Sequence, residues 1–292
     1  MTRILGALLA FALSVLVLVG MGFAGAYQYL APEIPDAASL RDVKSQLPLR
    51  VYTRDGKLLA QIGEQRRIPV AFDEIPPVVI DAFLAAEDAR FFTHPGVDWQ
   101  SLVRAMVANV SAGGVREGGG TITMQLARNT VLTSEKTLRR KLKEVFLAMR
   151  LEREFSKQEI LTLYLNRIFL GQRAYGIGAA AEVYFDKSVH DLTLTEAALI
   201  AGLPRSPSLD NPVASITRAH DRRAYVLRRM LELGKIDQAR HDAAHDEPIS
   251  SRLHGPIIEI DAPYVAEMVR AEMVREHGPD ALTAGYQVFT TL

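Results

Sequence analysis

The sequence contains no cysteine among its 292 residues. This absence excludes a disulfide framework, a thiolate nucleophile and a zinc site built from cysteine. The chain also lacks an excess of either charge, because 34 lysines and arginines balance 34 aspartates and glutamates. Nucleic-acid binders are typically basic, so we expect no nucleic-acid partner. The composition, 48% hydrophobic and 23% charged, is typical of a globular protein with one large domain or two small ones.

The first 32 residues lack acidic side chains, and Arg3 carries their only side-chain charge. Residues 4 to about 23 form an apolar run as long as a helix needs to cross a membrane. Arg3 lies on the short N-terminal side of this run, which predicts a cytoplasmic N-terminus and export of the rest of the chain. A cleaved signal peptide is the alternative, since Ala24-Gly25-Ala26 resembles a cleavage site. Because apolar cores of signal peptides are shorter, we expect a single-pass anchor over residues 1–31.

Local patterns divide the remainder into three segments. Residues 32–70 are predicted to hold a juxtamembrane linker and a β-hairpin, because Asp55-Gly56 separates two β-prone runs. Residues 71–245 have a helical hydrophobic period and predict a mainly α domain, with Asp98 as a helix N-cap. The expected helices cover residues 78–89, 99–110, 138–155, 157–165, 195–201 and 219–233. Residues 246–292 are expected to be a linker toward a further domain, with a helix over 262–277 and an unpartnered strand over 285–292.

The first cluster that could carry chemistry begins with Glu87 and Asp88 at the end of an expected helix. Two phenylalanines and a His94-Pro95-Gly96 turn follow. A carboxylate beside aromatic residues can have a raised pKa and act as a general base or acid. The alternative is a solvated acid, which the dipole disfavours at a helix C-terminus. His94 is expected to be a turn or packing residue, because no second ligand stands at metal-site spacing.

A second cluster consists of a glycine run, residues 118–120, that leads into hydroxyl side chains and a helix. Such a run can present backbone N–H groups and a helix N-terminus to a phosphate group. It is not a Walker P-loop, because the Lys-Ser/Thr ending is missing. The alternative interpretation is a linker without a binding role.

The third cluster places Arg140, Lys141 and Glu144 on one stripe of an expected helix. One interpretation is a solvated charged face with weak ion pairs. The functional interpretation requires an anionic ligand for the cations. A diphosphate would suit them, and the carboxylate would then handle a metal ion or the leaving group.

Together, these clusters resemble, in order, all five motifs of the peptidoglycan glycosyltransferases, glycosyltransferase family 51. The matching stretches are Glu87-Asp88-x-x-Phe91-x-x-His94-x-Gly96, Gly118-Gly119-Gly120-Thr121-Ile122-Thr123-Met124-Gln125, Arg140-Lys141-x-x-Glu144, Lys157-x-x-Ile160-Leu161-x-x-Tyr164-Leu165-Asn166 and Arg222-Arg223-x-x-Val226-Leu227-x-x-Met230. The flanks, such as Tyr52-x-x-Asp55-Gly56, are similar to the bifunctional class A penicillin-binding proteins. In those proteins a transpeptidase domain with Ser-x-x-Lys follows. This chain has no Ser-x-x-Lys, so we expect no transpeptidase activity from it.

The resemblance implies a mainly α, lysozyme-like glycosyltransferase domain behind a transmembrane helix, with a β-hairpin before it and a linker strand after it. It implies polymerisation of lipid II into glycan strands by inverting transfer from an undecaprenyl-diphosphate-linked donor. Glu87 would be the base for the acceptor 4-hydroxyl, and Glu144 the second catalytic carboxylate, at the leaving diphosphate. Glu144 would position or activate this diphosphate through a divalent metal such as Mg or Mn. No organic cofactor is expected. The implied substrate-binding residues are Thr121, Thr123, Gln125, Arg128, Lys136, Arg140, Lys141 and Asn166.

Two positions depart from the family pattern, which usually has serine at Gly120 and glutamine at Met124. We expect altered contacts with substrate sugars or phosphates there. One alternative is a lytic glycan-cleaving enzyme of the same fold, which needs one acid and no cationic cradle. Another is an inactive membrane-anchored cell-wall scaffold. Because both substrates are lipid-linked, the expected location is the periplasmic face of the bacterial inner membrane, with membrane lipid and cell-wall synthesis proteins as candidate partners.

Overall fold

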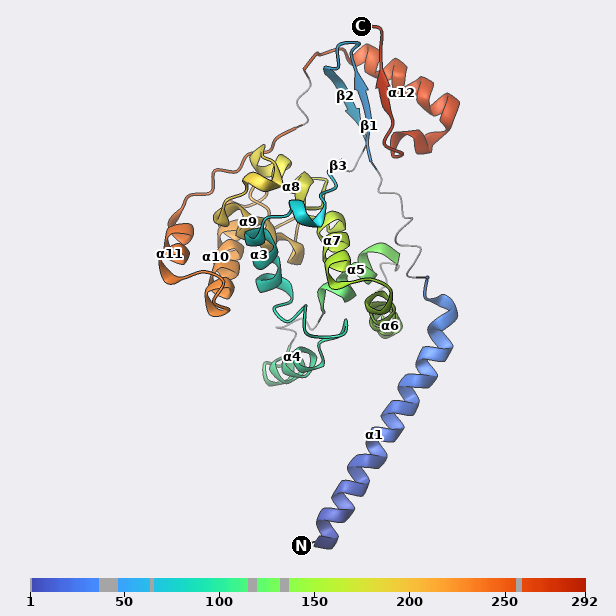
Figure 1. Cartoon of the computed structure of the whole chain (residues 1–292), viewed down its shortest axis with the longest axis vertical. Coiled ribbons are helices and arrows are strands. Elements are labelled where there is room, and N and C mark those ends of the chain that lie inside the picture. The colour runs from blue at the N-terminus through green and yellow to red at the C-terminus, as the bar shows by residue number, and fades with distance from the viewer. Residues whose placement is uncertain (1, 37–46, 64–65, 115–119, 132–136, 256–258) are drawn as a thin grey trace.

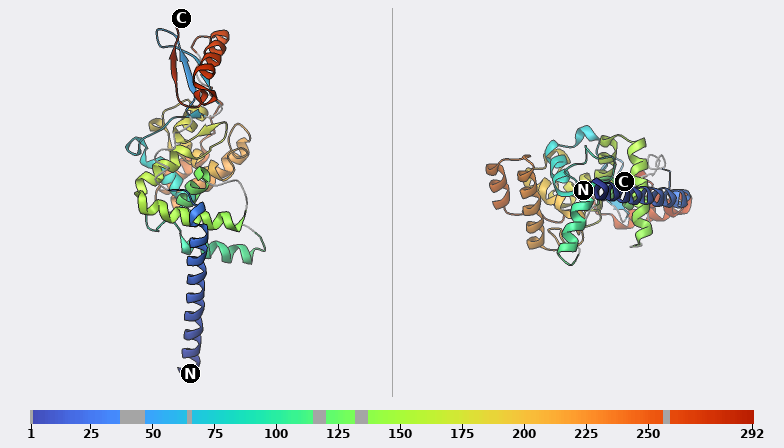
Figure 2. Two further views of the ribbon diagram at one scale, coloured as in Figure 1. Left: turned by 90° about the vertical axis from the view of Figure 1, so that its right-hand side faces the viewer. Right: turned by 90° about the horizontal axis from the view of Figure 1, so that it is seen from below.

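The protein consists of a long N-terminal helix, a helical domain and a small β unit (Figure 1). The computed structural model describes residues 2–36, 47–63, 66–114, 120–131, 137–255 and 259–292. In Figure 1 and in the left view of Figure 2, where the long axis is vertical, the N-terminal helix projects from one side of the helical domain. The β unit lies on the opposite side. The expected mainly α architecture is therefore confirmed.

The N-terminal helix, α1 (Thr2–Leu30), continues seven residues beyond the predicted apolar run. Among the described residues one span is long and apolar enough to cross a membrane. It runs from Leu13 in α1 to Glu33, just beyond the end of α1, with a mean hydropathy of 1.6. Large apolar side chains of α1, such as Phe11 and Leu18, are exposed. The helix is confirmed, and its insertion into a membrane stays a prediction.

The helical domain is built around one continuous apolar core. Its helices are α3 (Pro77–Glu87), α4 (Trp99–Ser111), α5 (Ile122–Val131), α6 (Leu138–Glu154), α7 (Lys157–Arg167), α8 (Ile177–Phe185), α9 (Leu194–Gly202), α10 (Ile216–Glu232) and α11 (Gln238–Asp246), with 3-10 turns η2 (Phe72–Glu74), η3 (Val189–Asp191) and η4 (Leu203–Arg205). The expected helices of this domain are all present, with ends that shift by up to three residues. Helix α8 escaped the sequence analysis because it is buried on nearly every side and has no amphipathic period.

The N-cap of α4 confirms a local prediction. Asp98 accepts a hydrogen bond from the backbone N–H of Ser101 at 3.0 Å and is ion-paired with Arg90. Burial alone would raise the pKa of Asp98, but the hydrogen bonds from Arg90 and Ser101 outweigh it and hold that pKa well below its ordinary value. The cap fixes the start of a helix whose outer side is apolar, because Val103, Met106 and Val107 are all exposed.

The end of α1 docks onto α6. The rings of Phe23 and Tyr27 meet the ring of Phe146 edge to face, with centroids 4.9 and 5.2 Å apart. Just after α1, in η1 (Ala31–Glu33), the carboxylate of Glu33 lies 2.5 Å from Lys143 Nζ. The base of the apolar helix is therefore fixed to the domain by both packing and charge.

The β unit joins two segments that lie far apart in the sequence. Strands β1 (Leu49–Tyr52) and β2 (Leu58–Ile62) form the predicted antiparallel hairpin. Strand β5 (Gln287–Phe289) pairs with β1 in parallel, so the expectation of an unpartnered strand is wrong. Its partner lies 238 residues away, as the Thr290 to Tyr52 hydrogen bond shows, and no local pattern reports such a pairing. Helix α12 (Pro263–His277) and η5 (Pro279–Leu282) complete the unit's own small core, while the predicted segment boundaries stay predictions.

A short parallel pair, β3 (Arg66–Arg67) with β4 (Ala174–Tyr175), brings the chain after the hairpin against α8. Gly178 on α8 makes this approach possible. A Cβ at this position would lie 2.4 Å from the carbonyl oxygen of Ile68 and 2.9 Å from Val70 Cγ2. Only glycine fits here without movement of the backbone.

We expect Gly178→Ala to lower the free energy of unfolding by about 1–3 kcal/mol, because the added methyl overpacks a backbone contact. Thermal and denaturant unfolding of the purified chain in detergent would measure this change. Gly255→Ala is the matched control, since a Cβ there meets nothing within 4 Å. Equal stability of the two variants would contradict the close approach.

Candidate functional site

The site is organised around Glu87, the last residue of α3. Gln125, one turn into α5, donates a hydrogen bond from Nε2 to a Glu87 carboxylate oxygen at 2.7 Å. The hydroxyl of Tyr164 on α7 donates to Gln125 Oε1 at 3.3 Å. Two predicted site residues therefore lie in contact, and Tyr164, which the sequence analysis did not single out, joins them.

The surroundings of Glu87 make its carboxyl more basic than usual. Burial raises the pKa of Glu87, while the Gln125 hydrogen bond and the positive charges of Arg222 and Arg128 limit the rise. The negative charge of Asp88 adds to it. A solvated acid at a helix end would show no such perturbation. A carboxyl with a raised pKa is suited to accept a proton from a substrate hydroxyl.

Arg222 on α10 is a functional candidate that the sequence analysis left out of the site. Its guanidinium lies 4.6 Å from the ring centre of Tyr225, and Nε donates to the carbonyl of Gly202. The next residue, Arg223, is buried and donates a hydrogen bond to the carbonyl of Glu247. The family motif contained both arginines, but only the fold separates the one near Glu87 from the structural one.

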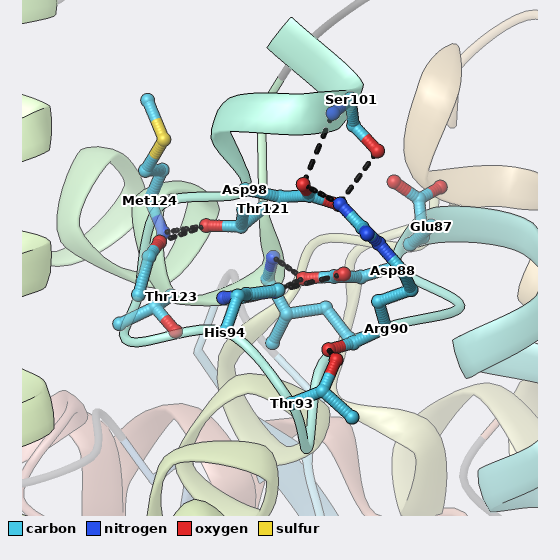
Figure 3. Close-up of polar contacts among 12 residues, drawn as sticks. Glu87, Asp88, Arg90, Thr93, His94, Asp98, Ser101, Thr121, Thr123 and Met124 are labelled. Atoms are coloured by element: carbon cyan, nitrogen blue, oxygen red, sulfur yellow. Dashed lines mark hydrogen bonds and ion pairs between the residues drawn. The ribbon is translucent and has the colours of Figure 1, made fainter.

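Asp88 has a structural role beside Glu87. Its buried carboxylate lies 3.0 Å from His94 Nε2 and accepts a hydrogen bond from the N–H of Ile122 at 3.0 Å. Figure 3 shows Asp88 directed at His94, whereas Glu87 points to another side. His94 is buried, which confirms its expected packing role.

The hydroxyls of Thr121 and Thr123 are engaged inside the protein. Thr121 donates to the carbonyl of Gly96 at 2.6 Å, and Thr123 donates to Glu152 at 2.6 Å. Both side chains are buried. In this arrangement they brace the start of α5, and their predicted contact with substrate stays a prediction.

The two departures from the family pattern lie in different places. Met124 is 1% exposed and belongs to the core, so the expected change in substrate contacts does not follow for this side chain. Gly120 lies close to α6, because a Cβ there would stand 3.8 Å from Lys141 Nζ. A larger residue at position 120 would face the cation of the third motif.

Glu144, the second catalytic carboxylate that the resemblance implies, is buried, with 1% exposure. Lys141 Nζ donates to Glu144 Oε2 at 3.0 Å, and Arg140 Nε lies 3.5 Å from Oε1. The solvated-face interpretation is therefore wrong for Glu144. Both cations stay partly accessible, so they can still meet an anionic group. Arg128 on α5 is exposed, and the predicted cation Lys136 lies outside the described residues.

A metal ion at Glu144 finds no support from neighbouring ligands. Within the described ranges, no three histidine or acidic side chains are arranged to hold a metal ion. Glu144 is paired with cations instead. These residues do not fit a metal held by the protein alone, and we derive no chemistry through one.

Asn166 holds the fold together at the end of α7. Its amide accepts from the N–H of Val70 and donates to the carbonyl of Val70, both at 2.8 Å, and it also donates to Thr162. The side chain therefore bonds to the backbone of Val70 much as a neighbouring strand would. A role in binding substrate, which the resemblance implied, stays a prediction.

Comparisons with known proteins agree with the motif order. Residues 55–231 match the family described as Transglycosylase. The chain is 51% identical to penicillin-binding protein 1A of Pseudomonas aeruginosa over 93% of its length, and 51% identical to that of Escherichia coli over 94%. The crystal structure of penicillin-binding protein 1A from Haemophilus influenzae is similar, with a TM-score of 0.52, 39% identity, and coverage of 86% of this chain and 28% of that one. The chain spans 33% of the length of each of the first two relatives.

We expect Asn166→Ala to lower the free energy of unfolding by roughly 1–3 kcal/mol, because two backbone groups of Val70 lose their partner. Denaturant unfolding would measure the loss. Asn129→Ala is a suitable control, since Asn129 is exposed on α5. Unchanged stability with a raised KM for a glycan substrate would instead show that Asn166 binds substrate.

Proposed function

The chain belongs to the transglycosylase family, and from that premise we propose that it polymerises lipid II into peptidoglycan strands at the periplasmic face of the bacterial inner membrane. The observation that carries this proposal is a pair of carboxylates in different electrostatic settings. Glu87 has a raised pKa, whereas Glu144 is buried between Lys141 and Arg140. Two such groups suit a reaction that needs a base beside the attacking hydroxyl and positive charge beside the leaving group.

The base is Glu87. In the proposed reaction its carboxylate accepts the proton of the acceptor 4-hydroxyl on lipid II. The hydroxyl oxygen then forms a bond to the anomeric carbon of the donor strand. The bond from that carbon to undecaprenyl diphosphate breaks, and the electron pair leaves with the diphosphate. Attack and departure on opposite faces invert the configuration at the anomeric carbon.

The leaving diphosphate is received by cations on α5 and α6. Arg140 and Lys141 are held in place by Glu144, whose own burial requires such partners. Arg128 extends the positive surface, and Lys136 is the further cation that the resemblance implies. Charge-assisted contacts to phosphate oxygens would stabilise the negative charge that develops there.

Two apolar features support a membrane location. Helix α1 is long and apolar enough to span, and α4 exposes Trp99, Val103, Met106, Val107 and Val110. Both lie on the same side of the helical domain (Figure 2). An amphipathic helix with such a face is suited to lie in the lipid–water interface. This placement would bring the site to lipid-linked sugars, with the N-terminus in the cytoplasm.

The alternatives fit the site less well. A lytic enzyme would need a single acid and no cationic cradle, yet the cations around Glu144 are fixed by the fold. An inactive scaffold would have no need of a carboxyl with a raised pKa, such as that of Glu87.

We expect Glu87→Gln to abolish strand synthesis, because the amide cannot accept the proton. The purified chain in detergent would be incubated with fluorescent lipid II, with and without Mg²⁺, and the products separated by size. The unchanged chain should give a ladder of strands, and Glu144→Gln should also lose it. Glu276→Gln, an exposed acid on α12, is the control that should keep the ladder. A ladder from Glu87→Gln would remove Glu87 as the base.

We expect Lys141→Met to raise the KM for lipid II by roughly tenfold or more, which corresponds to loss of one hydrogen bond to a charged group. Initial rates over a range of lipid II concentrations would measure KM and kcat. Arg153→Met removes an exposed cation from the same helix and should leave both unchanged. If the two variants behave alike, Lys141 is not part of the cradle.

A further inference from the structure

We propose that Tyr164 and Gln125 act as a positioning pair that fixes the carboxylate of Glu87, and that Gln125 works through Glu87 rather than by touching substrate. The inference rests on the proposed function, because it assigns supporting roles around the proposed base. It changes the assignment of Gln125, which the motif resemblance had placed among substrate-binding residues.

The direction of the hydrogen bonds is set by their chemistry. An ionised carboxylate only accepts hydrogen bonds, so the NH₂ end of the Gln125 amide must face Glu87, at 2.7 Å. The amide oxygen then faces Tyr164, whose hydroxyl donates to it at 3.3 Å. The opposite orientation of the amide would put its oxygen against the carboxylate, with no proton between them. The carboxylate of Glu87 therefore selects the orientation of the amide, and the hydroxyl of Tyr164 supplies a donor for the amide oxygen in that orientation.

Tyr164 is a fixed reference point for this chain of hydrogen bonds. It is 1% exposed, and its ring meets the ring of Phe83 edge to face, with centroids 6.3 Å apart. Phe83 lies on α3, one turn before Glu87. The helix that carries the base is thus braced by the same tyrosine that donates a hydrogen bond to the glutamine. Such preorganisation removes side-chain freedom that glutamine would otherwise have.

Both ends of the Gln125 amide are already used by protein groups, and the side chain is 9% exposed. A second N–H and a second lone pair remain on the amide, but so little of the side chain is exposed that substrate has limited access to them. Tyr164 stays a donor throughout the working pH range, because burial first, and then the charge of Glu87, raise its pKa well above the ordinary value. The pair is therefore suited to hold a geometry and not to exchange protons.

Positioning through Glu87 has a consequence for pH that substrate binding lacks. Burial raises the pKa of Glu87, and the hydrogen bond from Gln125 opposes that rise. Loss of the bond therefore raises the pKa further. Since the base works only when deprotonated, the acidic side of the rate profile should move to higher pH.

The test compares Tyr164→Phe, Gln125→Leu and the isosteric Gln125→Glu with a matched control, Tyr184→Phe. Tyr184 is also buried and donates its hydroxyl to the carbonyl of Leu170 at 2.7 Å, but it has no link to Glu87. Initial rates of lipid II polymerisation would be recorded from about pH 5 to 9, with kcat and KM separated. Thermal unfolding of each variant would show that it is folded.

We expect Tyr164→Phe to lower kcat several-fold with KM little changed. The acidic limb of the pH–rate profile should also move to higher pH. Gln125→Leu and Gln125→Glu should do the same more strongly, and Tyr184→Phe should do neither. The proposal is overturned if Gln125→Leu raises KM and leaves kcat and the acidic limb in place. It is also overturned if Tyr164→Phe matches Tyr184→Phe. Activity in Glu87→Gln would instead overturn the proposed base, and that result is independent of Tyr164.

Discussion

The geometry of the site depends on the buried carboxylate of Asp88. It accepts the N–H of Ile122 at the start of α5 and lies against His94, so it fastens the end of α3 to the beginning of α5. A negative charge at a helix N-terminus is also favoured by the helix dipole. This joint brings Gln125, one turn further along α5, to Glu87. Neighbouring acids thus divide the work, since one builds the contact between helices and the other is left for chemistry.

Helix α6 links the site to α1, the proposed membrane anchor. Lys143 and Phe146 face the end of α1, whereas Lys141 and Glu144 belong to the cationic cluster beside α5. Because one helix carries both sets, the height of the cations above the anchor is fixed by a rigid element and not by a flexible linker. In the proposed function the leaving diphosphate is attached to a lipid, so it too would lie at a fixed depth in the membrane. The cations can lie at the depth of the diphosphate only if the end of α1 stays docked on α6.

Local features of the fold were predictable from sequence, because periodicity, the Asp55-Gly56 turn and the Asp98 cap act over a few residues. Family resemblance supplied Glu87 and Glu144 as candidates. It could not show which way polar side chains point. Asn166 is turned to the backbone of Val70, and the pairing of β5 with β1 joins segments that share no local pattern. Such contacts are decided by the tertiary fold, where a side chain of the right type can serve either structure or chemistry.

The parallel pairing of β1 with β5 also sets how the chain carries mechanical load. The covalent path from α1 enters β1. The N–H of Arg50 donates to the carbonyl of Tyr286 just before β5, and the N–H of Thr290 just after β5 donates to the carbonyl of Tyr52. Tension between the two ends of the described chain can cross this pair without passing along residues 66–255. Parallel strands pulled from opposite ends are loaded in shear, so their hydrogen bonds resist together instead of opening one by one. The helical domain would therefore not be stretched by tension that is carried through β1 and β5.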